Sequence, residues 1–273
     1  MIFKIDIEDM VLKSSLSNTM CVLFKFIKKI IPILKQKIKK IEIAINSNNE
    51  LKKRIYYGSI FAIITIFAIL CGNVIYMLVV FTALCLMIYE LLKMLSNIEE
   101  TNNQMFIFLR YWGLIYIAIC CVSLILIRES KQGLAISIWM FLTIWSVDCF
   151  SYIFGKKFGK LKLAPVVSPG KTYEGAIFGT IGGLFVSMIC YKIFSTKLIN
   201  SFSSVSFSLF SIIVIILAQL SDLSESYIKR QCCIKDSGNI IPGHGGILDR
   251  LDSILIVAPF VFIIIWLNGG VLF

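Results

Sequence analysis

Charged residues are scarce in this chain: they make up 16% of its 273 residues, whereas hydrophobic residues make up 58%. The apolar residues form long continuous runs rather than the alternating or 3.6-residue patterns of half-buried strands and helices. Runs of this length can cross a bilayer, so the composition excludes an ordinary soluble domain. We predict an all-α, polytopic membrane protein with about seven transmembrane helices, and the pattern also fits six or eight. The predicted spans are residues 55–72, 74–92, 105–127, 134–153, 176–194, 205–227 and 251–268.

The chain also lacks the cysteine and histidine patterns of metal-binding modules. None of its nine cysteines forms a C-x-x-C pair, and His244 is its single histidine. These absences argue against a zinc site or a redox motif. Most cysteines lie in or beside predicted spans, where a thiol behaves as a small apolar group. The adjacent Cys232 and Cys233 would chelate a metal poorly, so we interpret them as structural.

Residues 1–50 differ from the remainder and predict an N-terminal extension that precedes a multi-pass membrane domain at 51–273. The first ten residues carry three acids, unlike the positively charged start of a signal peptide. Residues 20–45 alternate apolar residues with lysines. Two interpretations remain open for this segment: a basic amphipathic helix on an anionic membrane surface, or a solvated and partly ordered extension.

Basic residues are distributed unevenly between the predicted loops. Lys52, Lys53 and Arg54 precede the first span, so the positive-inside rule places that end in the cytoplasm. Counting spans from there, the loops at 154–175 and 228–250 are both cytoplasmic, and both are basic. The net charge of +11 therefore indicates membrane topology. We expect no nucleic-acid partner, because no segment interleaves aromatic and basic residues as a base-stacking groove does.

Acidic residues are rare in the second half of the chain, where only seven follow Glu129. All of them fall in two clusters at predicted cytoplasmic ends of spans. Acids beside membrane-like sequence are costly unless they are paired or used, so both clusters are candidate functional sites. The seven acids are Asp148, Glu174, Asp222, Glu225, Asp236, Asp249 and Asp252.

The larger cluster occupies residues 221–252. Asp222, Glu225 and Lys229 are spaced three and four residues apart, so they share one helix face. A second acid pair with three-residue spacing precedes the last span. Between the two acid pairs, residues 242–246 form a glycine loop whose backbone N–H groups could approach an anion closely. Two carboxylate clusters, a glycine loop and flanking bases suit a magnesium-bound polyphosphate.

The smaller cluster runs from Asp148 to Gly175. Ser168, Lys171 and Thr172 could hold phosphate oxygens at the N-terminal end of the fifth predicted helix, where the helix dipole favours anions. A Walker A loop is excluded, because the glycine, lysine and threonine here lack the earlier glycine at the required spacing and the preceding strand.

Both clusters resemble the signatures of a known family. The segment from Ser226 reads S-Y-I-K-R, four residues, then K-D-S-G, and ends in I-P-G-H-G-G-I-L-D-R-L-D at Asp252. This long run is similar to the signature of phosphatidate cytidylyltransferases, also called CDP-diglyceride synthases, and S-P-G-K-T-Y-E-G in the smaller cluster is similar to a second segment of that family. Ser221 departs from the pattern, since the family usually has glycine before its first metal-binding aspartate. The resemblance begins near Leu51 and covers roughly four-fifths of the chain.

The resemblance implies transfer of a cytidylyl group from CTP to phosphatidic acid, which gives CDP-diacylglycerol and pyrophosphate for phospholipid synthesis. With the residue pattern, it assigns magnesium as cofactor and three sets of site residues. The expected catalytic residues are Asp222, Asp249, Lys229, Arg250 and His244; the metal ligands are Asp222, Asp249 and Glu225; the substrate-binding residues are Ser168, Lys171, Thr172, Arg230, Lys235, Gly245, Gly246, Asp148 and Glu174.

These assignments have structural alternatives. Asp222 and Asp249 could form intramembrane ion pairs with neighbouring bases, and Glu225 could simply pair with Lys229. The basic side chains could contact lipid headgroups, and His244 could orient the loop or a phosphate oxygen instead of acting as a base.

Two other functions remain open: a CTP-dependent lipid kinase, and an ion-coupled membrane transporter. A transporter would more naturally show internal repeats and broken midplane helices, and the sequence shows neither. We expect CTP, phosphatidic acid and the lipid bilayer as partners, and a homodimer is compatible with the sequence. The expected location is a bacterial inner (plasma) membrane, with the active site facing the cytoplasm.

Overall fold

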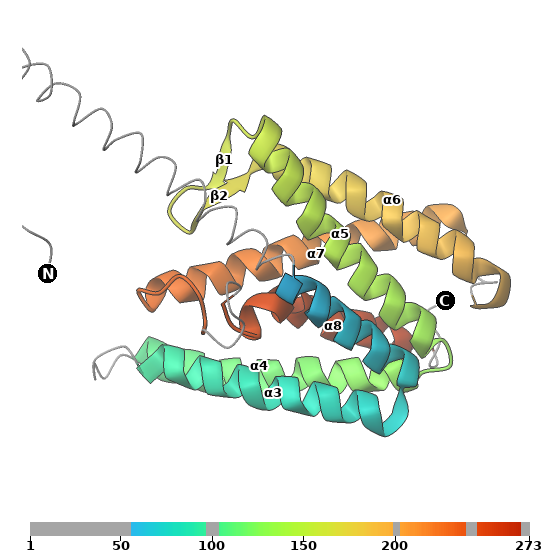
Figure 1. Cartoon of the computed structure of the whole chain (residues 1–273), viewed down its shortest axis with the longest axis horizontal. Helices are drawn as coiled ribbons and strands as arrows, with labels where there is room; N and C mark the ends of the chain where they lie inside the picture. Colours follow the sequence, from blue (N-terminus) through green and yellow to red (C-terminus); the bar gives the residue numbers. More distant parts are fainter. Residues whose placement is uncertain (1–55, 97–103, 199–202, 239–244, 269–273) are drawn as a thin grey trace, which may run out of the picture. The chain divides into compact units, whose positions relative to one another are not determined.

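The computed structural model describes residues 56–96, 104–198, 203–238 and 245–268 (Figure 1). All of them belong to the second of two units into which the chain divides, residues 56–273. The two interpretations of residues 1–50 concern a segment that lies outside the described residues.

Helices make up nearly all of the described part of the chain. Six of its helices are long and apolar enough to cross a membrane, and a seventh is shorter than the about 20 residues that a span needs. The predicted all-α, polytopic class is therefore confirmed, and the first predicted span is the short one. The helices are Tyr56–Cys71, α3 (Asn73–Ser96), α4 (Gln104–Glu129), α5 (Gly133–Phe158), α6 (Tyr173–Leu198), α7 (Ser204–Gln231) and α8 (Leu248–Leu267).

The short helix and α3 meet at a tight turn made by Gly72, whose φ of 62° is left-handed and favours glycine. Arg128 of α4 packs against this turn, and its Nε donates a hydrogen bond of 2.8 Å to the carbonyl of Ile69. A Cβ on Gly72 would lie 2.6 Å from the Arg128 guanidinium. The two adjacent predicted segments, 55–72 and 74–92, are therefore two separate helices, as expected.

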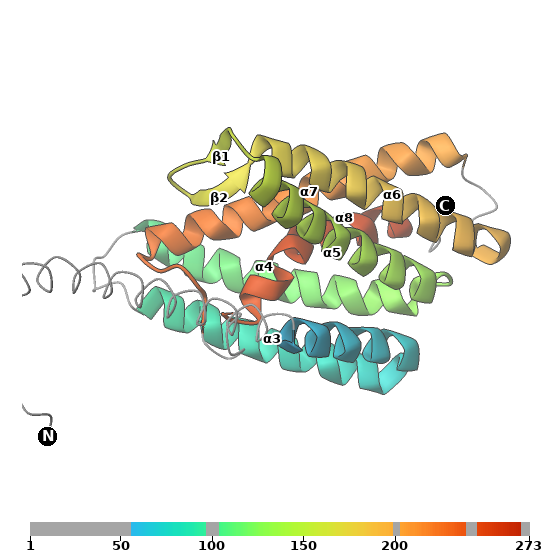
Figure 2. The same cartoon turned by 45° about the horizontal axis from the view of Figure 1, so that its top comes forward.

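The loops that carry the two acid clusters lie at the same end of the helix bundle (Figures 1 and 2). α5 packs against α6, and α7 packs against α8, which in turn contacts α4. Two long helices, α6 and α7, separate the two loops along the chain. The first leads away from one end of the bundle and the second leads back to it, so both loops lie at that end. This arrangement puts the C-terminus of α7 and the N-terminus of α8 beside the segment between α5 and α6.

A short hairpin replaces the loop predicted between α5 and α6. β1 (Lys162–Ala164) and β2 (Ser168–Thr172) pair antiparallel, with Lys162 opposite Thr172 and Ala164 opposite Ser168. α5 continues through Phe158, and α6 begins at Tyr173 directly after β2. The hairpin is therefore fixed to two long helices at its base.

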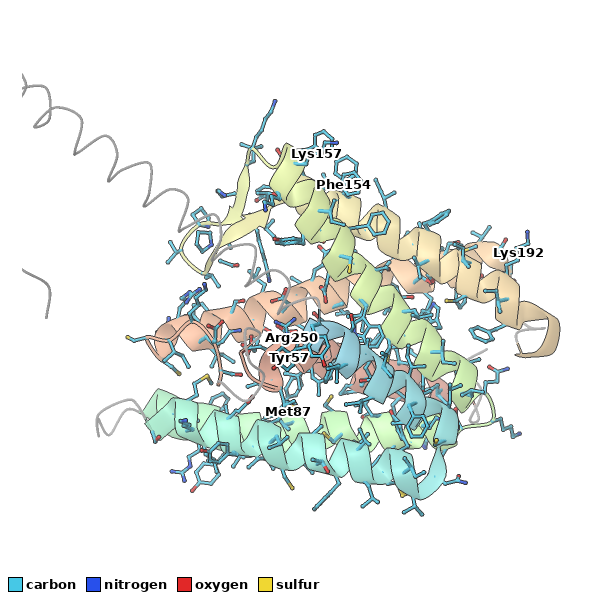
Figure 3. All side chains as sticks on the ribbon, in the orientation of Figure 1. Tyr57, Met87, Phe154, Lys157, Lys192 and Arg250 are labelled. Carbon is cyan, nitrogen blue, oxygen red and sulfur yellow. The ribbon has the colours of Figure 1, made fainter. Side chains whose placement is uncertain are left out.

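The bundle buries a continuous apolar core and also carries large apolar side chains on its outer surface (Figure 3). Val214 and Val257 are fully buried, whereas Phe185 and Trp266 are more than half exposed. An apolar exterior suits contact with lipid. Among the labelled side chains in Figure 3, Lys157 lies at the hairpin end of α5.

Candidate active site

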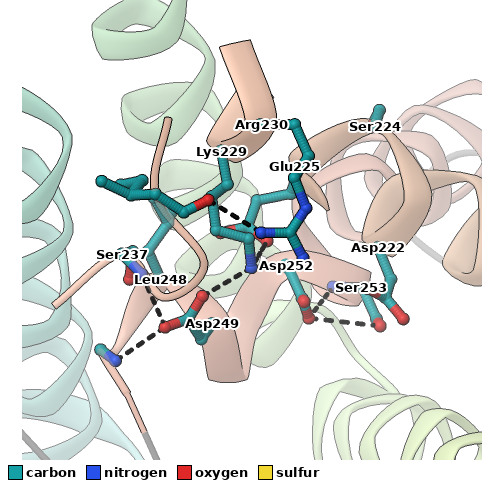
Figure 4. A network of polar contacts seen from close by, with 12 residues as sticks. Asp222, Ser224, Glu225, Lys229, Arg230, Ser237, Leu248, Asp249, Asp252 and Ser253 are labelled. Atoms are coloured by element: carbon teal, nitrogen blue, oxygen red, sulfur yellow. Dashed lines mark hydrogen bonds and ion pairs between the residues drawn. The ribbon is translucent and has the colours of Figure 1, made fainter. Parts of the chain in front are cut away.

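The acids predicted on α7 and α8 meet where the C-terminal half of α7 passes the beginning of α8 (Figure 4). Ser221 joins the two helices there: its hydroxyl donates to the backbone carbonyl of Asp252 and accepts from the backbone N–H of Ile256 at 3.4 Å. Ser221 is buried. The residue that departs from the family pattern thus has a role in this chain, because it ties the two acidic helices together.

Lys229 bridges an acid from each helix. Its ammonium forms an ion pair with Glu225 one turn earlier on α7, and it lies 2.6 Å from Oδ1 of Asp249 on α8. Lys229 is 8% exposed and Glu225 is 5% exposed. Buried charges of this kind are stable only when they are paired, which these three side chains achieve together.

The other oxygen of Asp249 is held by the backbone of the glycine loop. Oδ2 accepts hydrogen bonds from the N–H of Ser237 at 2.9 Å and of Gly246 at 2.8 Å. Gly245 has a φ of 82°, and a Cβ there would lie 2.3 Å from this oxygen. The sequence predicted loop N–H groups that approach an anion; in the structure the anion at Gly246 is the protein's own carboxylate.

The hairpin brings the smaller cluster onto the larger one. Nζ of Lys171 on β2 lies 2.8 Å from Oδ2 of Asp222 on α7, and the two side chains are 26% and 28% exposed. Asp148 of α5 lies within range of the charges of Asp222 and Lys171, and the charges of Asp148 and Asp222 both reach Asp252. The two clusters that the sequence keeps apart therefore form one site.

Several predicted substrate-binding residues hold the hairpin in place. Nε of Arg230 donates to the carbonyl of Val167 at 2.9 Å, and another guanidinium nitrogen donates to the carbonyl of Ile234 at 3.0 Å. Thr172 accepts the N–H of Gly175 at 3.1 Å, which caps α6. Glu174 likewise accepts the backbone N–H that precedes β1, at 3.3 Å from each of its oxygens.

The remaining predicted site residues lie around this centre or outside the described residues. Ser168 starts β2, and Lys235 is exposed in the loop after α7. Arg250 is exposed at the start of α8, and its charge reaches Asp148. His244 belongs to the undescribed segment 239–244, so its predicted role as base or loop-orienting residue is not addressed by the geometry.

The donor chemistry fits a hard cation, although the side chains are arranged around lysines. Magnesium prefers carboxylate oxygens, which Asp222, Asp249 and Glu225 supply. Oε1 of Glu225 is buried and has no hydrogen-bond partner among the residues that the structure describes. In the described part of the chain, however, no three Asp, Glu, His or Cys side chains lie close enough to hold a metal ion, and Lys171 and Lys229 balance the acids.

One residue of the site is absent from the predictions. Glu90 of α3 is 1% exposed and accepts hydrogen bonds from the backbone N–H groups of Ile247 at 3.0 Å and Leu248 at 2.9 Å. The hydroxyl of Ser237 also donates to it, at 3.1 Å. The available signal was Glu90 itself, an acid inside the apolar run 74–92, since such a residue is costly in a membrane span.

Comparison with known proteins identifies the family. The sequence model described as the Cytidylyltransferase family matches residues 98–268. Relatives of the chain include proteins named phosphatidate cytidylyltransferase. The protein from Rickettsia prowazekii (strain Madrid E) is 40% identical over 204 residues, which are 72% of this chain and 90% of the relative. The protein from Rickettsia bellii (strain RML369-C) is 42% identical over 181 residues, 66% of this chain and 78% of the relative. The protein from Bacillus subtilis (strain 168) is 41% identical over 152 residues, 55% of each chain. The polytopic chain whose two acidic clusters meet at one end of its helix bundle belongs to the cytidylyltransferase family.

Proposed function

We propose that this protein transfers the cytidylyl group of CTP to phosphatidic acid, giving CDP-diacylglycerol and pyrophosphate. The observation that carries the proposal is the convergence of Lys171 on β2 with Asp222 on α7, which joins both family-like clusters in one charged site. That site lies at an end of membrane-crossing helices, where a lipid headgroup and a soluble nucleotide can meet. The names of the relatives support the same reaction.

The reaction requires positioning and charge neutralisation more than acid–base chemistry. The phosphate monoester of phosphatidic acid has a second pKa near about 6, so at neutral pH it is mostly dianionic. One of its oxygens attacks the α-phosphorus of CTP, a new P–O bond forms, and the bond to the β-phosphate breaks with its electrons leaving on pyrophosphate. Groups that align the two phosphates and balance the leaving charge therefore supply the catalysis.

Some basic side chains of the site bind other groups of the protein, whereas others are candidates for contact with substrate. Lys229 is buried between two acids and keeps α7 and α8 in register. Among the described residues, Lys171 forms an ion pair with Asp222 alone and its Nζ makes no hydrogen bond, so it can take a phosphate oxygen as a partner. Arg250 is exposed at the same end of the bundle and is the second candidate for phosphate contact. Arg230, in contrast, uses its guanidinium on backbone carbonyls of the hairpin and loop.

Magnesium is the proposed cofactor, and Asp222, Asp249 and Glu225 would hold it. When bound, the ion would neutralise polyphosphate charge, the usual role of magnesium in phosphoryl chemistry. The hard oxygen donors and the unpartnered buried Oε1 of Glu225 support this assignment. Asp148 and Asp252 bring further carboxyl oxygens within electrostatic range of Asp222.

We propose that the site faces the cytoplasm of a bacterial inner (plasma) membrane. Both loops at the site end are basic, as the positive-inside rule requires of cytoplasmic loops, and CTP is then available to the site. The acyl chains of phosphatidic acid would remain in the bilayer beside the helices. A homodimer stays a prediction from the sequence.

The decisive experiment uses the purified protein in lipid nanodiscs with phosphatidic acid. CTP is labelled either at the α-phosphate or at the γ-phosphate, with magnesium present or removed by chelation. We expect α-label in a nucleotide-lipid, γ-label only in pyrophosphate, and no product without magnesium. Label from the γ-phosphate on a lipid would instead show a CTP-dependent kinase, and no transfer of either label would refute both enzymes.

A further inference from the structure

Glu90 reaches the candidate site from α3, a helix to which the sequence assigned no function. It lies inside the apolar span and outside the residues that the family model matches, 98–268. Its Oε1 accepts a hydrogen bond from the N–H of Ile247. Its Oε2 accepts hydrogen bonds from the N–H of Leu248 and from the hydroxyl of Ser237. Such a buried acid is expensive in a membrane protein, so a simple contact between α3 and α8 would be better served by an apolar residue.

Glu90 completes a helix end that α8 cannot complete itself. The residue before α8, Ile247, makes no side-chain capping hydrogen bond. The first N–H groups of a helix lack partners within the helix, and a carboxylate there also interacts favourably with the helix dipole. Glu90 supplies this cap from a different helix, to the N–H groups of Ile247 and Leu248.

Glu90 and Asp249 hold the same two backbone segments. At Ser237, the N–H donates to Asp249 and the hydroxyl donates to Glu90. At the other segment, the N–H of Gly246 donates to Asp249, and the next N–H, that of Ile247, donates to Glu90. Movement of the Glu90 side chain would therefore displace the donors that fix the Asp249 carboxylate.

The glycines of the loop fit closely around Glu90. A Cβ on Gly246 would lie 2.3 Å from Oε2 of Glu90, and a Cβ on Gly238 would lie 2.8 Å from Oε1. A side chain at either position would force the Glu90 carboxyl group to move. At these two positions, the absence of a side chain makes room for an internal carboxyl group.

We propose that Glu90 is a positioning residue of the transfer reaction, which acts by fixing the N-terminus of α8 and thereby the carboxylate of Asp249. Its effect on turnover rests on the proposed function, whereas its effect on the α8 backbone does not. Glu90 does not contact Lys229 or Asp222 in any hydrogen bond or ion pair of the described residues, so its influence passes through Ser237 and residues 246–248.

The test compares Glu90→Gln, Ser237→Ala and the double variant in nanodiscs, with Glu129→Gln as the control. Gln keeps the size of Glu but turns an NH₂ group toward backbone donors, and Ser237→Ala removes the hydroxyl while leaving the N–H that binds Asp249. Glu129 is an exposed acid at the opposite end of the bundle. Steady-state kcat and KM for CTP, the folded fraction, and amide hydrogen exchange across 245–255 are measured on the same samples.

We expect Glu90→Gln to lower kcat by about 10- to 100-fold per folded molecule, because a misplacement of about 1 Å costs about 100-fold. Exchange should accelerate at residues 246–249 and remain unchanged in α5 and α6. Because Ser237 and Glu90 act on each other, the double variant should lose no more than the worse single variant. Glu129→Gln should match the unmodified protein.

Three results would overturn the proposal: normal kcat in folded Glu90→Gln, losses that multiply in the double variant, or faster exchange throughout the bundle. The last result would show a residue needed only for folding. If the unmodified protein makes no CDP-diacylglycerol, the proposed function fails, and the exchange at residues 246–249 still decides whether Glu90 fixes α8.

Discussion

The two aspartates with which the sequence predicted a metal site have different surroundings. Asp222 is partly exposed and is paired with Lys171 on the hairpin. Asp249 is more buried and is fixed by Lys229 and two backbone N–H groups. The same change, loss of the carboxylate charge, should therefore affect stability differently at the two positions.

For Asp222→Asn we expect turnover to fall by orders of magnitude with little loss of stability. The partly exposed pair with Lys171 contributes at most about 1 kcal/mol to folding. Folded fraction and specific activity are measured together, with and without additional magnesium, which should restore activity only in part. Glu129→Gln, which removes the same charge at an exposed position at the end of α4, serves as a control for a change of charge alone. Near-normal specific activity would remove Asp222 from the site.

For Asp249→Asn we expect both activity and stability to fall. Within the described part of the chain, the change leaves Lys229 in an ion pair with Glu225 alone. Breaking a buried ion pair costs about 3 kcal/mol. Thermal unfolding in detergent measures the loss of stability, and activity per folded molecule measures the loss of function. An unchanged melting temperature would contradict the arrangement around Lys229, and unchanged activity would contradict a role in the reaction.

The sequence predicted most residues of the candidate site but could not assign their contacts. Asp222, Glu225 and Lys229 could be placed on one face, because helical spacing determines that relationship. Glu90 could not be connected to Ser237, since 147 residues separate them and no periodic pattern links the two. The use of Arg230 on backbone carbonyls was also hidden, because a basic residue in a signature suggests phosphate binding.

At the scale of elements, the hairpin was the least predictable part of the fold. Its strands are three and five residues long, and the second contains Pro169 and Gly170, which are depleted in strands. The hairpin segment has no alternation of apolar and polar residues that would distinguish it from a loop. The helices were predictable because long apolar runs have few other structures available in a bilayer.

We expect Arg230→Lys to weaken the attachment of the hairpin while keeping the positive charge of the side chain. An ammonium group cannot reproduce the two hydrogen bonds that the guanidinium makes to Val167 and Ile234. Amide exchange over residues 161–172 should accelerate, and KM for CTP should rise several-fold, with a smaller change in kcat. A fall in kcat without faster exchange would mean that Arg230 contacts phosphate rather than the hairpin.

At the scale of the whole molecule, the sequence predicted the connectivity of the bundle and the common end of its two basic loops. It did not predict that the first span would be a short helix turning sharply at Gly72. That turn depends on Arg128, which approaches from α4, and such a contact cannot be read from the residues around Gly72.

Cysteine labelling from each side of the membrane tests the proposed orientation. On a cysteine-depleted background, Lys160→Cys and Lys235→Cys, both exposed at the site end, should react with an impermeant reagent only from the cytoplasmic side. Lys131→Cys, exposed in the turn between α4 and α5, should react only from the other side. Labelling of positions 160 and 235 from opposite sides would overturn the topology.

The position of Asp249 and Asp252 on α8 has a consequence for biogenesis. Asp148 and Asp222 lie on α5 and α7, and Lys171 lies on the hairpin between α5 and α6, whereas Asp252 and Asp249, the partner of Lys229, arrive only with α8. We expect a nascent chain that has inserted everything through α7 to contain Lys171 and Asp222 but to lack the α8 carboxylate that pairs with Lys229, and therefore to consume no nucleotide. Insertion of α8 then adds Asp249 and Asp252 and completes the site, so we expect no turnover before the last helix is made. A chain ended after Gln231 should insert and yet show no turnover.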